Sequence, residues 1–121
     1  MRRVLIVDDS PTETHVFRSM LEKHDFQVLV AGTGEEGVRI AREVRPDLIL
    51  MDIVMPGMNG FQATRKLSRD ELTNAIPVII ISTKDQETDR IWGMCQGARD
   101  YLVKPVSEDQ LLSKVRSVMA A

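Results

Sequence analysis

The sequence predicts an α/β domain in which five parallel strands alternate with five helices, a doubly wound (βα)5 fold. Short apolar runs recur along the chain, and such runs are typical of strands that helices cover on both faces. Helical patterns with their own start signals lie between the runs. Each connection is long enough for the right-handed crossover that joins parallel strands. The apolar runs occupy residues 4–7, 26–30, 48–51, 78–81 and 101–103.

The runs differ in strength. VLIV, LILM and VIII are entirely apolar, so they fit strands that are buried on both faces. FQVLV at 26–30 contains Gln27, and YLV at 101–103 is short. We expect these two weaker strands to lie nearer the edges of the sheet.

Capping residues mark the start of the first two helices. Ser10 and Pro11 form a cap and first-turn pair, and Thr33 with Glu36 three residues later is a capping box. The first helix is expected to bury Val16, Phe17, Met20 and Leu21. The second is expected to bury Gly37, Val38, Ala41 and Val44.

The remaining helices have similar signals. Asn59 can cap the third, and Ser107 with Gln110 is a capping box that opens the fifth. The fourth is predicted over roughly residues 86–96, with Gly97 after it. It carries Ile91 and Cys95 four residues apart, and we expect Cys95 to be a small core residue. The third helix is expected to bury Phe61, Ala63, Thr64 and Leu67. The fifth is expected to bury Leu111, Leu112, Val115, Val118 and Met119.

The composition is that of an ordinary globular protein and excludes several classes. The 121 residues suit one domain, 1–121, with no output domain after it. A net charge of −2 does not indicate a nucleic-acid or membrane surface, and no run approaches the roughly 18 apolar residues of a membrane span. One cysteine excludes an intramolecular disulfide and a multi-cysteine zinc site. We expect a cytoplasmic monomer without nucleic-acid binding or membrane insertion.

Polar residues follow the predicted strands at the point where each strand ends. In open α/β sheets, ligands bind beyond the carboxyl ends of the strands. These residues should therefore meet at one edge of the sheet. They are Asp8 and Asp9, then Asp52, then Ser82 and Thr83, and finally Lys104 and Pro105.

The chemistry of this set points to phosphoryl transfer beside a metal ion. Three nearby carboxylates repel one another and need a cation or raised pKa values. Mg²⁺ prefers oxygen ligands and commonly binds one or two carboxylates with a phosphate oxygen. Asp52 could then act as a nucleophile, with Lys104 supplying a positive charge. Each residue alone is more often a cap or turn residue, so the prediction depends on their coincidence at successive strand ends.

These residues resemble the response-regulator receiver domains, and the resemblance covers Arg3 to Ala120. The segments GFQATR, IPVIIISTKDQETDRIWG and QGARDYLVKP are similar to single-domain, chemotaxis-type receivers of the type IV pilus twitching-motility system. The resemblance implies the flavodoxin-like receiver fold with strand order 2-1-3-4-5. It also implies a signalling protein that catalyses only its own phosphorylation and dephosphorylation.

The resemblance implies a role for each residue of the site. Asp52 would accept a phosphoryl group from a phosphohistidine of a sensor histidine kinase. Ser82 and Lys104 would contact the phosphoryl oxygens, and Pro105 would follow a cis peptide bond. The expected Mg²⁺ ligands are Asp8, Asp9, Asp52 and the backbone carbonyl of Val54.

The resemblance also implies how the signal leaves. Ser82 and Tyr101 would be the switch residues, and a downstream protein would bind the face formed by the fourth helix, fifth strand and fifth helix. Trp92 on the fourth helix is either ordinarily half-buried or a partner-facing anchor.

The chain departs from the family pattern at several positions. Serine stands at position 82 where threonine is more common, and Thr83 stands where a small residue is usual. Val54 and Lys84 occupy positions that tune dephosphorylation. The apolar Val54 should hold an attacking water poorly, so we expect a long-lived phosphorylated form.

Alternative functions remain at this stage. The chain could be a phosphate sink for a shared kinase, or a receiver that works by binding alone. A Mg²⁺-dependent phosphohydrolase would need a second acid two residues after Asp52, where Val54 stands. A flavin mononucleotide binder would need a phosphate-binding first loop, but DDSPTE places two carboxylates there.

Overall fold

The computed structural model describes residues 2–120 and contains one five-stranded parallel sheet with the order β2-β1-β3-β4-β5. The predicted fold class and strand order are confirmed, and the two weaker runs form the edge strands. The strands are β1 (Arg3–Val7), β2 (Gln27–Ala31), β3 (Leu48–Met51), β4 (Val78–Ser82) and β5 (Asp100–Val103).

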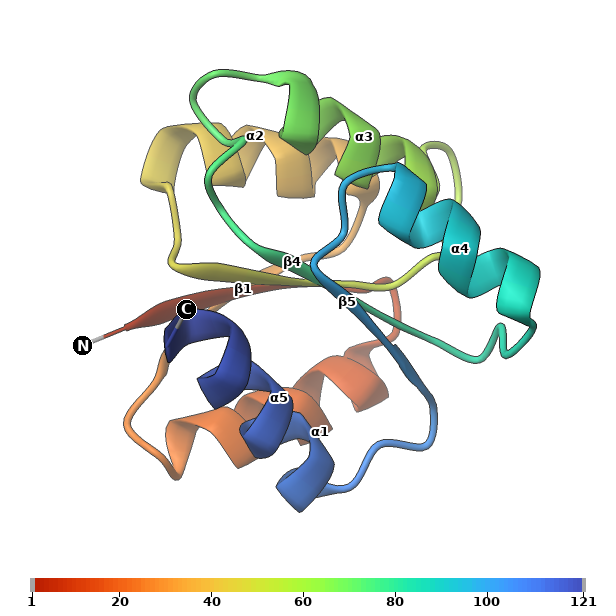
Figure 1. Ribbon diagram of the computed structural model, residues 1–121. Helices are drawn as coiled ribbons and strands as arrows, with labels where there is room; N and C mark the ends of the chain where they lie inside the picture. Colours follow the sequence, from red (N-terminus) through yellow and green to blue (C-terminus); the bar gives the residue numbers. More distant parts are fainter. Residues whose placement is uncertain (1, 121) are drawn as a thin grey trace.

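Five helices cover the two faces of this sheet. Helices α1 and α5 lie on one face, and α2, α3 and α4 lie on the other (Figure 1). This division follows from right-handed crossovers on both sides of β1. The helices are α1 (Pro11–Glu22), α2 (Gly34–Val44), α3 (Gly60–Arg69), α4 (Glu87–Cys95) and α5 (Glu108–Ala120).

The sheet separates the core into two apolar clusters. Successive side chains of a strand point to opposite faces, so Val4 and Ile6 join the cluster beneath α1 and α5. Leu5 and Val7 join the cluster beneath the other three helices. Continuous apolar runs are therefore required in the central strands, because both faces of each strand are buried.

The predicted helix caps are present. The side chains of Ser10, Thr33 and Asn59 each accept a hydrogen bond from a backbone amide in the first turn of their helix. At the start of α5, Ser107 and Gln110 bond each other's backbone amides with their side chains. Such caps stabilise helix ends by about 1 kcal/mol each.

Two expectations about buried residues are wrong. Val16 is 43% exposed, because α1 turns Thr14, Phe17 and Leu21 toward the sheet instead. Cys95 is exposed, as is Ile91. The reason is that α4 contacts the sheet through Gly93, its buried residue, so side chains elsewhere on its turns point outward.

Helix lengths and hydropathies bear on membrane insertion. Across residues 2–120, the chain has no helix that combines the length and apolar character of a membrane span.

Candidate functional site

Strand register brings the polar residues of the site together. Val7 pairs with Met51, so Asp8 and Asp52, which follow them, extend neighbouring strands by one position. The Asp52 amide donates to the Val7 carbonyl at 2.9 Å. On the other side, the Lys104 amide donates to the Ser82 carbonyl at 2.8 Å. The backbone ladder therefore holds the residues after β1, β3 and β5 at one edge of the sheet.

Three carboxylates converge at this edge. One oxygen from each of Asp8, Asp9 and Asp52 lies within 4.8 Å of the others. Asp8 is buried, Asp52 is half-buried and Asp9 is exposed, so the cluster opens to solvent on one side. Three hard oxygen donors with an open side suit a Mg²⁺ ion that keeps some of its waters.

The pKa values of two of these acids are raised. Burial, followed by the neighbouring Asp8 carboxylate, raises the pKa of Asp52 to about 6, although Lys104 opposes the shift. Burial also raises the pKa of Asp8, against the opposing effects of the Ser10 amide and Lys104. The positive charge of Lys104 thus does not fully offset the negative charges of the two carboxylates. A divalent cation would supply the missing positive charge.

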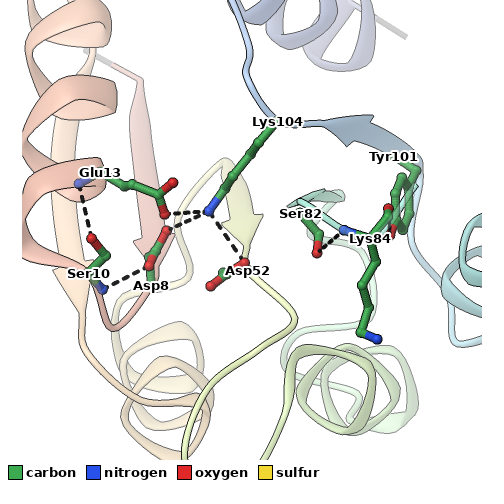
Figure 2. Close-up of polar contacts among 8 residues, drawn as sticks. All are labelled: Asp8, Ser10, Glu13, Asp52, Ser82, Lys84, Tyr101 and Lys104. Atoms are coloured by element: carbon green, nitrogen blue, oxygen red, sulfur yellow. Dashed lines mark hydrogen bonds and ion pairs between the residues drawn. The ribbon is translucent and has the colours of Figure 1, made fainter. Parts of the chain in front are cut away.

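Lys104 is the cation of the site (Figure 2). Its ammonium lies 3.5 Å from Asp52 Oδ1 and 3.4 Å from Asp8 Oδ2, and its side chain is only 9% exposed. Burial lowers the pKa of Lys104, but the hydrogen bond to Glu13 and the charges of Asp52 and Asp8 outweigh burial and raise it. The lysine is therefore charged and directed toward the carboxylate that the sequence predicts as nucleophile.

Glu13 is a residue of the site that sequence reasoning missed. Its Oε2 lies 2.5 Å from Lys104 Nζ, closer than either aspartate. Glu13 lies in the first turn of α1, which directly follows the loop that carries Asp8. An acid in the first turn of a helix that starts at the site is the signal that could have revealed it.

The two predicted switch residues are linked through Lys84. Ser82 is fully buried, and its Oγ accepts a hydrogen bond from the Lys84 amide at 3.2 Å. The hydroxyl of Tyr101 donates to the Lys84 carbonyl at 2.7 Å. Tyr101 is 3% exposed, so its ring lies inward in this structure. One backbone unit therefore contacts both side chains (Figure 2).

The other predicted residues lie around the rim or on α4. The Lys104–Pro105 peptide bond is cis, as the family resemblance implies. Thr83 and the Val54 side chain are exposed, the latter at 60%. Trp92 on α4 is 53% exposed, which is compatible with both interpretations of this residue.

The sequence is similar to those of known proteins. The family model described as the response regulator receiver domain matches residues 4–116. Protein PilH of Pseudomonas aeruginosa is 62% identical over 120 residues, which cover 99% of each chain. Response regulator PleD of Caulobacter vibrioides is 39% identical over 96% of this chain, which spans 26% of that protein.

Solved structures are also similar. Chemotaxis protein CheY4 of Vibrio cholerae superposes with a TM-score of 0.92 at 29% identity, over 98% of each chain. The receiver domain of a sensor histidine kinase from P. aeruginosa gives a TM-score of 0.92 at 29% identity, over 99% of this chain and 98% of that one. That structure contains a magnesium ion coordinated in its active site cleft. By its sequence and its fold, this chain belongs to the response regulator receiver domain family.

Proposed function

We propose that this protein is a phosphorelay response regulator whose Asp52 accepts a phosphoryl group from a sensor histidine kinase in a Mg²⁺-dependent reaction. The single observation that carries this proposal is the convergence of the Asp8, Asp9 and Asp52 carboxylates with the Lys104 ammonium at one sheet edge. The 62% identity to PilH and the resemblance to twitching-motility receivers support a role in type IV pilus or chemotaxis-like motility control.

The transfer is a displacement at phosphorus. A carboxylate oxygen of Asp52 forms the new P–O bond while the P–N bond to the kinase imidazole breaks. The electron pair of that bond returns to the imidazole nitrogen. Asp52 must be ionised to attack, and Lys104, 3.5 Å from it, faces the charge that builds on the phosphoryl oxygens. The exchange takes place in the cytoplasm, where ATP loads the kinase.

The donor set fits Mg²⁺. Asp8, Asp9 and Asp52, with the backbone carbonyl of Val54, would hold the ion. When bound, Mg²⁺ neutralises charge on the carboxylates and on the incoming phosphoryl oxygens. The raised pKa values of Asp8 and Asp52 support this assignment, because they indicate carboxylates that lack a full complement of positive charge.

The signal leaves through a changed protein-binding surface on a monomer. A phosphoryl group on Asp52 offers new acceptors to the Ser82 hydroxyl, which now accepts from the Lys84 amide. Since the Lys84 carbonyl also accepts from Tyr101, movement of this loop would be transmitted to β5 and α4. The surface of α4, β5 and α5 then serves as the partner face. Its exposed apolar side chains include Ile91, Trp92, Met94 and Val103.

Phosphotransfer from purified histidine kinases tests the acceptor. The wild type should take label from a phosphorylated kinase, or from a small phosphodonor with Mg²⁺, and Asp52→Asn should take none. No labelling of the wild type from any donor would overturn the proposal, and equal labelling of Asp52→Asn would exclude Asp52 as the acceptor.

A second experiment tests the partner face. Capture of a binding protein that increases with phosphorylation would support signal output, and Trp92→Ala should weaken that capture while leaving Asp52 labelling unchanged. If phosphorylation captures no partner but drains label from a kinase that serves another receiver, the protein is a phosphate sink.

A further inference from the structure

Glu13 is the nearest anionic partner of Lys104. The Lys104 ammonium lies 2.5 Å from Glu13 Oε2, against 3.4 Å from Asp8 and 3.5 Å from Asp52 (Figure 2). Short charge-assisted contacts are the stronger ones. In this structure, the ammonium of the lysine that faces Asp52 therefore has its shortest contact with a residue on another element, α1.

The two ends of this ion pair differ in exposure. The Lys104 side chain is 9% exposed, whereas that of Glu13 is 41% exposed. The backbone of Glu13 is anchored, because its amide donates to the Ser10 side chain at the start of α1. Its carboxylate reaches the ammonium from the solvent side, so it can rotate into water without opening the core.

A metal ion at the carboxylate cluster would not remove this competitor. The cluster consists of Asp8, Asp9 and Asp52, and Glu13 is not a member of it. Mg²⁺ would neutralise the aspartates and weaken their hold on Lys104, but Glu13 would remain beside the lysine. The four carboxylates and one ammonium carry a net charge of −3 when all are ionised. Glu13 thus opposes an incoming anion both by its own charge and by pairing the site's cation.

We propose that Glu13 is a positioning residue that sequesters Lys104 in the unphosphorylated state and thereby sets how tightly the site accepts a phosphoryl group on Asp52. This inference rests on the proposed function and deepens it. Loading the site requires the Lys104 ammonium to exchange Glu13 for a phosphoryl oxygen. Glu13 therefore favours the unloaded state by the free energy of that exchange.

A purely structural role makes a different prediction. If the pair only fastens α1 to the residue after β5, removing the Glu13 charge should lower the free energy of unfolding and leave anion affinity unchanged. Sequestration predicts tighter anion binding, and it requires Lys104 to be present for most of that gain.

The test uses the full chain with saturating Mg²⁺ and beryllium trifluoride, which stands in for the phosphoryl group. We expect Glu13→Gln to tighten the dissociation constant about threefold to tenfold, in the range of a partly exposed ion pair. In the Lys104→Met background the same substitution should give less than half of that free-energy gain. NMR titration supplies the constants, and urea unfolding confirms that each variant is folded.

Glu22→Gln is the matched control, because Glu22 lies on the same helix but pairs with Arg18. It should leave the affinity unchanged. An unchanged affinity in Glu13→Gln overturns the inference, and so does an equal gain with and without Lys104, which would indicate general charge repulsion. Failure of the wild type to bind beryllium trifluoride with Mg²⁺ would instead overturn the proposed function and the inference together.

Discussion

At Asp52, burial and a neighbouring negative charge both raise the pKa of the carboxyl group. Its side chain is 11% exposed and faces the Asp8 carboxylate, and the Lys104 ammonium only partly offsets these effects. Ionisation of Asp52, which the chemistry requires, is therefore less favourable in the folded protein than in the unfolded chain. A cation bound beside Asp52 would offset this cost.

The pH dependence of stability follows from this raised pKa. Because the folded pKa of about 6 exceeds the 3.8 of an unperturbed aspartate, stability is lost as pH rises from about 4 through 6. Asp52→Asn removes this loss. Without Mg²⁺, we expect its advantage in free energy of unfolding over the wild type to grow by about 2 kcal/mol between pH 4 and pH 7. Urea unfolding in a chelator measures it, and a constant difference across pH would contradict the assignment.

We expect Val54 to influence the water that would hydrolyse an aspartyl phosphate on Asp52. Its side chain is apolar and 60% exposed, so it can form no hydrogen bond to such a water. Val54→Asn adds a donor and an acceptor, and one hydrogen bond of about 1 kcal/mol corresponds to roughly fivefold faster decay of the phosphorylated form. Loss of label from the purified phosphoprotein gives the rate. Val54→Leu is the apolar control, and equal decay of Val54→Asn and the wild type would refute the prediction.

At the scale of elements, the start of α3 packs directly against the backbone of Asp52. Gly60 approaches so closely that a Cβ there would overlap the Asp52 carbonyl oxygen and lie 2.8 Å from Ile53 Cα. Because backbone atoms cannot rotate away, Gly60→Ala should push α3 off the loop after β3. We expect a destabilisation of about 2–4 kcal/mol and weakened Mg²⁺ binding.

Urea unfolding and Mg²⁺ titration test this prediction, and Gly32→Ala is the matched control. A Cβ at Gly32 meets nothing within 4 Å, so the change should be within about 0.5 kcal/mol. Similar stabilities for the two variants would show that the close approach at Gly60 can relax.

Helix α4 packs closely on the sheet because its buried residue, Gly93, has no side chain. A Cβ on Gly93 would lie 2.8 Å from Ile80 Cδ1 and 3.3 Å from Tyr101 Cδ2. Gly93→Ala should therefore displace α4 from the sheet and disturb Tyr101 beneath it. We expect faster amide hydrogen exchange in α4, with exchange in β1 and β3 unchanged. Exchange in α4 that matches the wild type would contradict this account of its packing.

At the scale of the whole molecule, metal binding and stability are linked. A ligand that binds only the folded state stabilises it, by about 2.7 kcal/mol at one hundred times its dissociation constant. We expect Mg²⁺ to raise the free energy of unfolding by this mechanism, at constant ionic strength. Asp9→Asn should lose most of the response while changing metal-free stability little, because Asp9 is exposed. An equal Mg²⁺ response in both proteins would exclude Asp9 as a ligand.

The sequence by itself determined the features that depend on local pattern. Continuous apolar runs indicated strands buried on both faces, and capping side chains such as Asn59 indicated the starts of helices. Parallel topology then required Asp8, Asp52 and Lys104 to share one sheet edge, because parallel strands all end there. The family resemblance added the roles of these residues and the strand order.

Only the tertiary structure decided how the elements rotate and approach one another. The exposure of Val16 and Cys95 depends on which face α1 and α4 present to the sheet, and Gly93 sets that face for α4. The contact between Glu13 and Lys104 joins residues 91 positions apart. The acid in the first turn of α1 indicates that Glu13 lies near the site. Its pairing with Lys104 is decided by how α1 and the end of β5 pack across the same edge of the sheet.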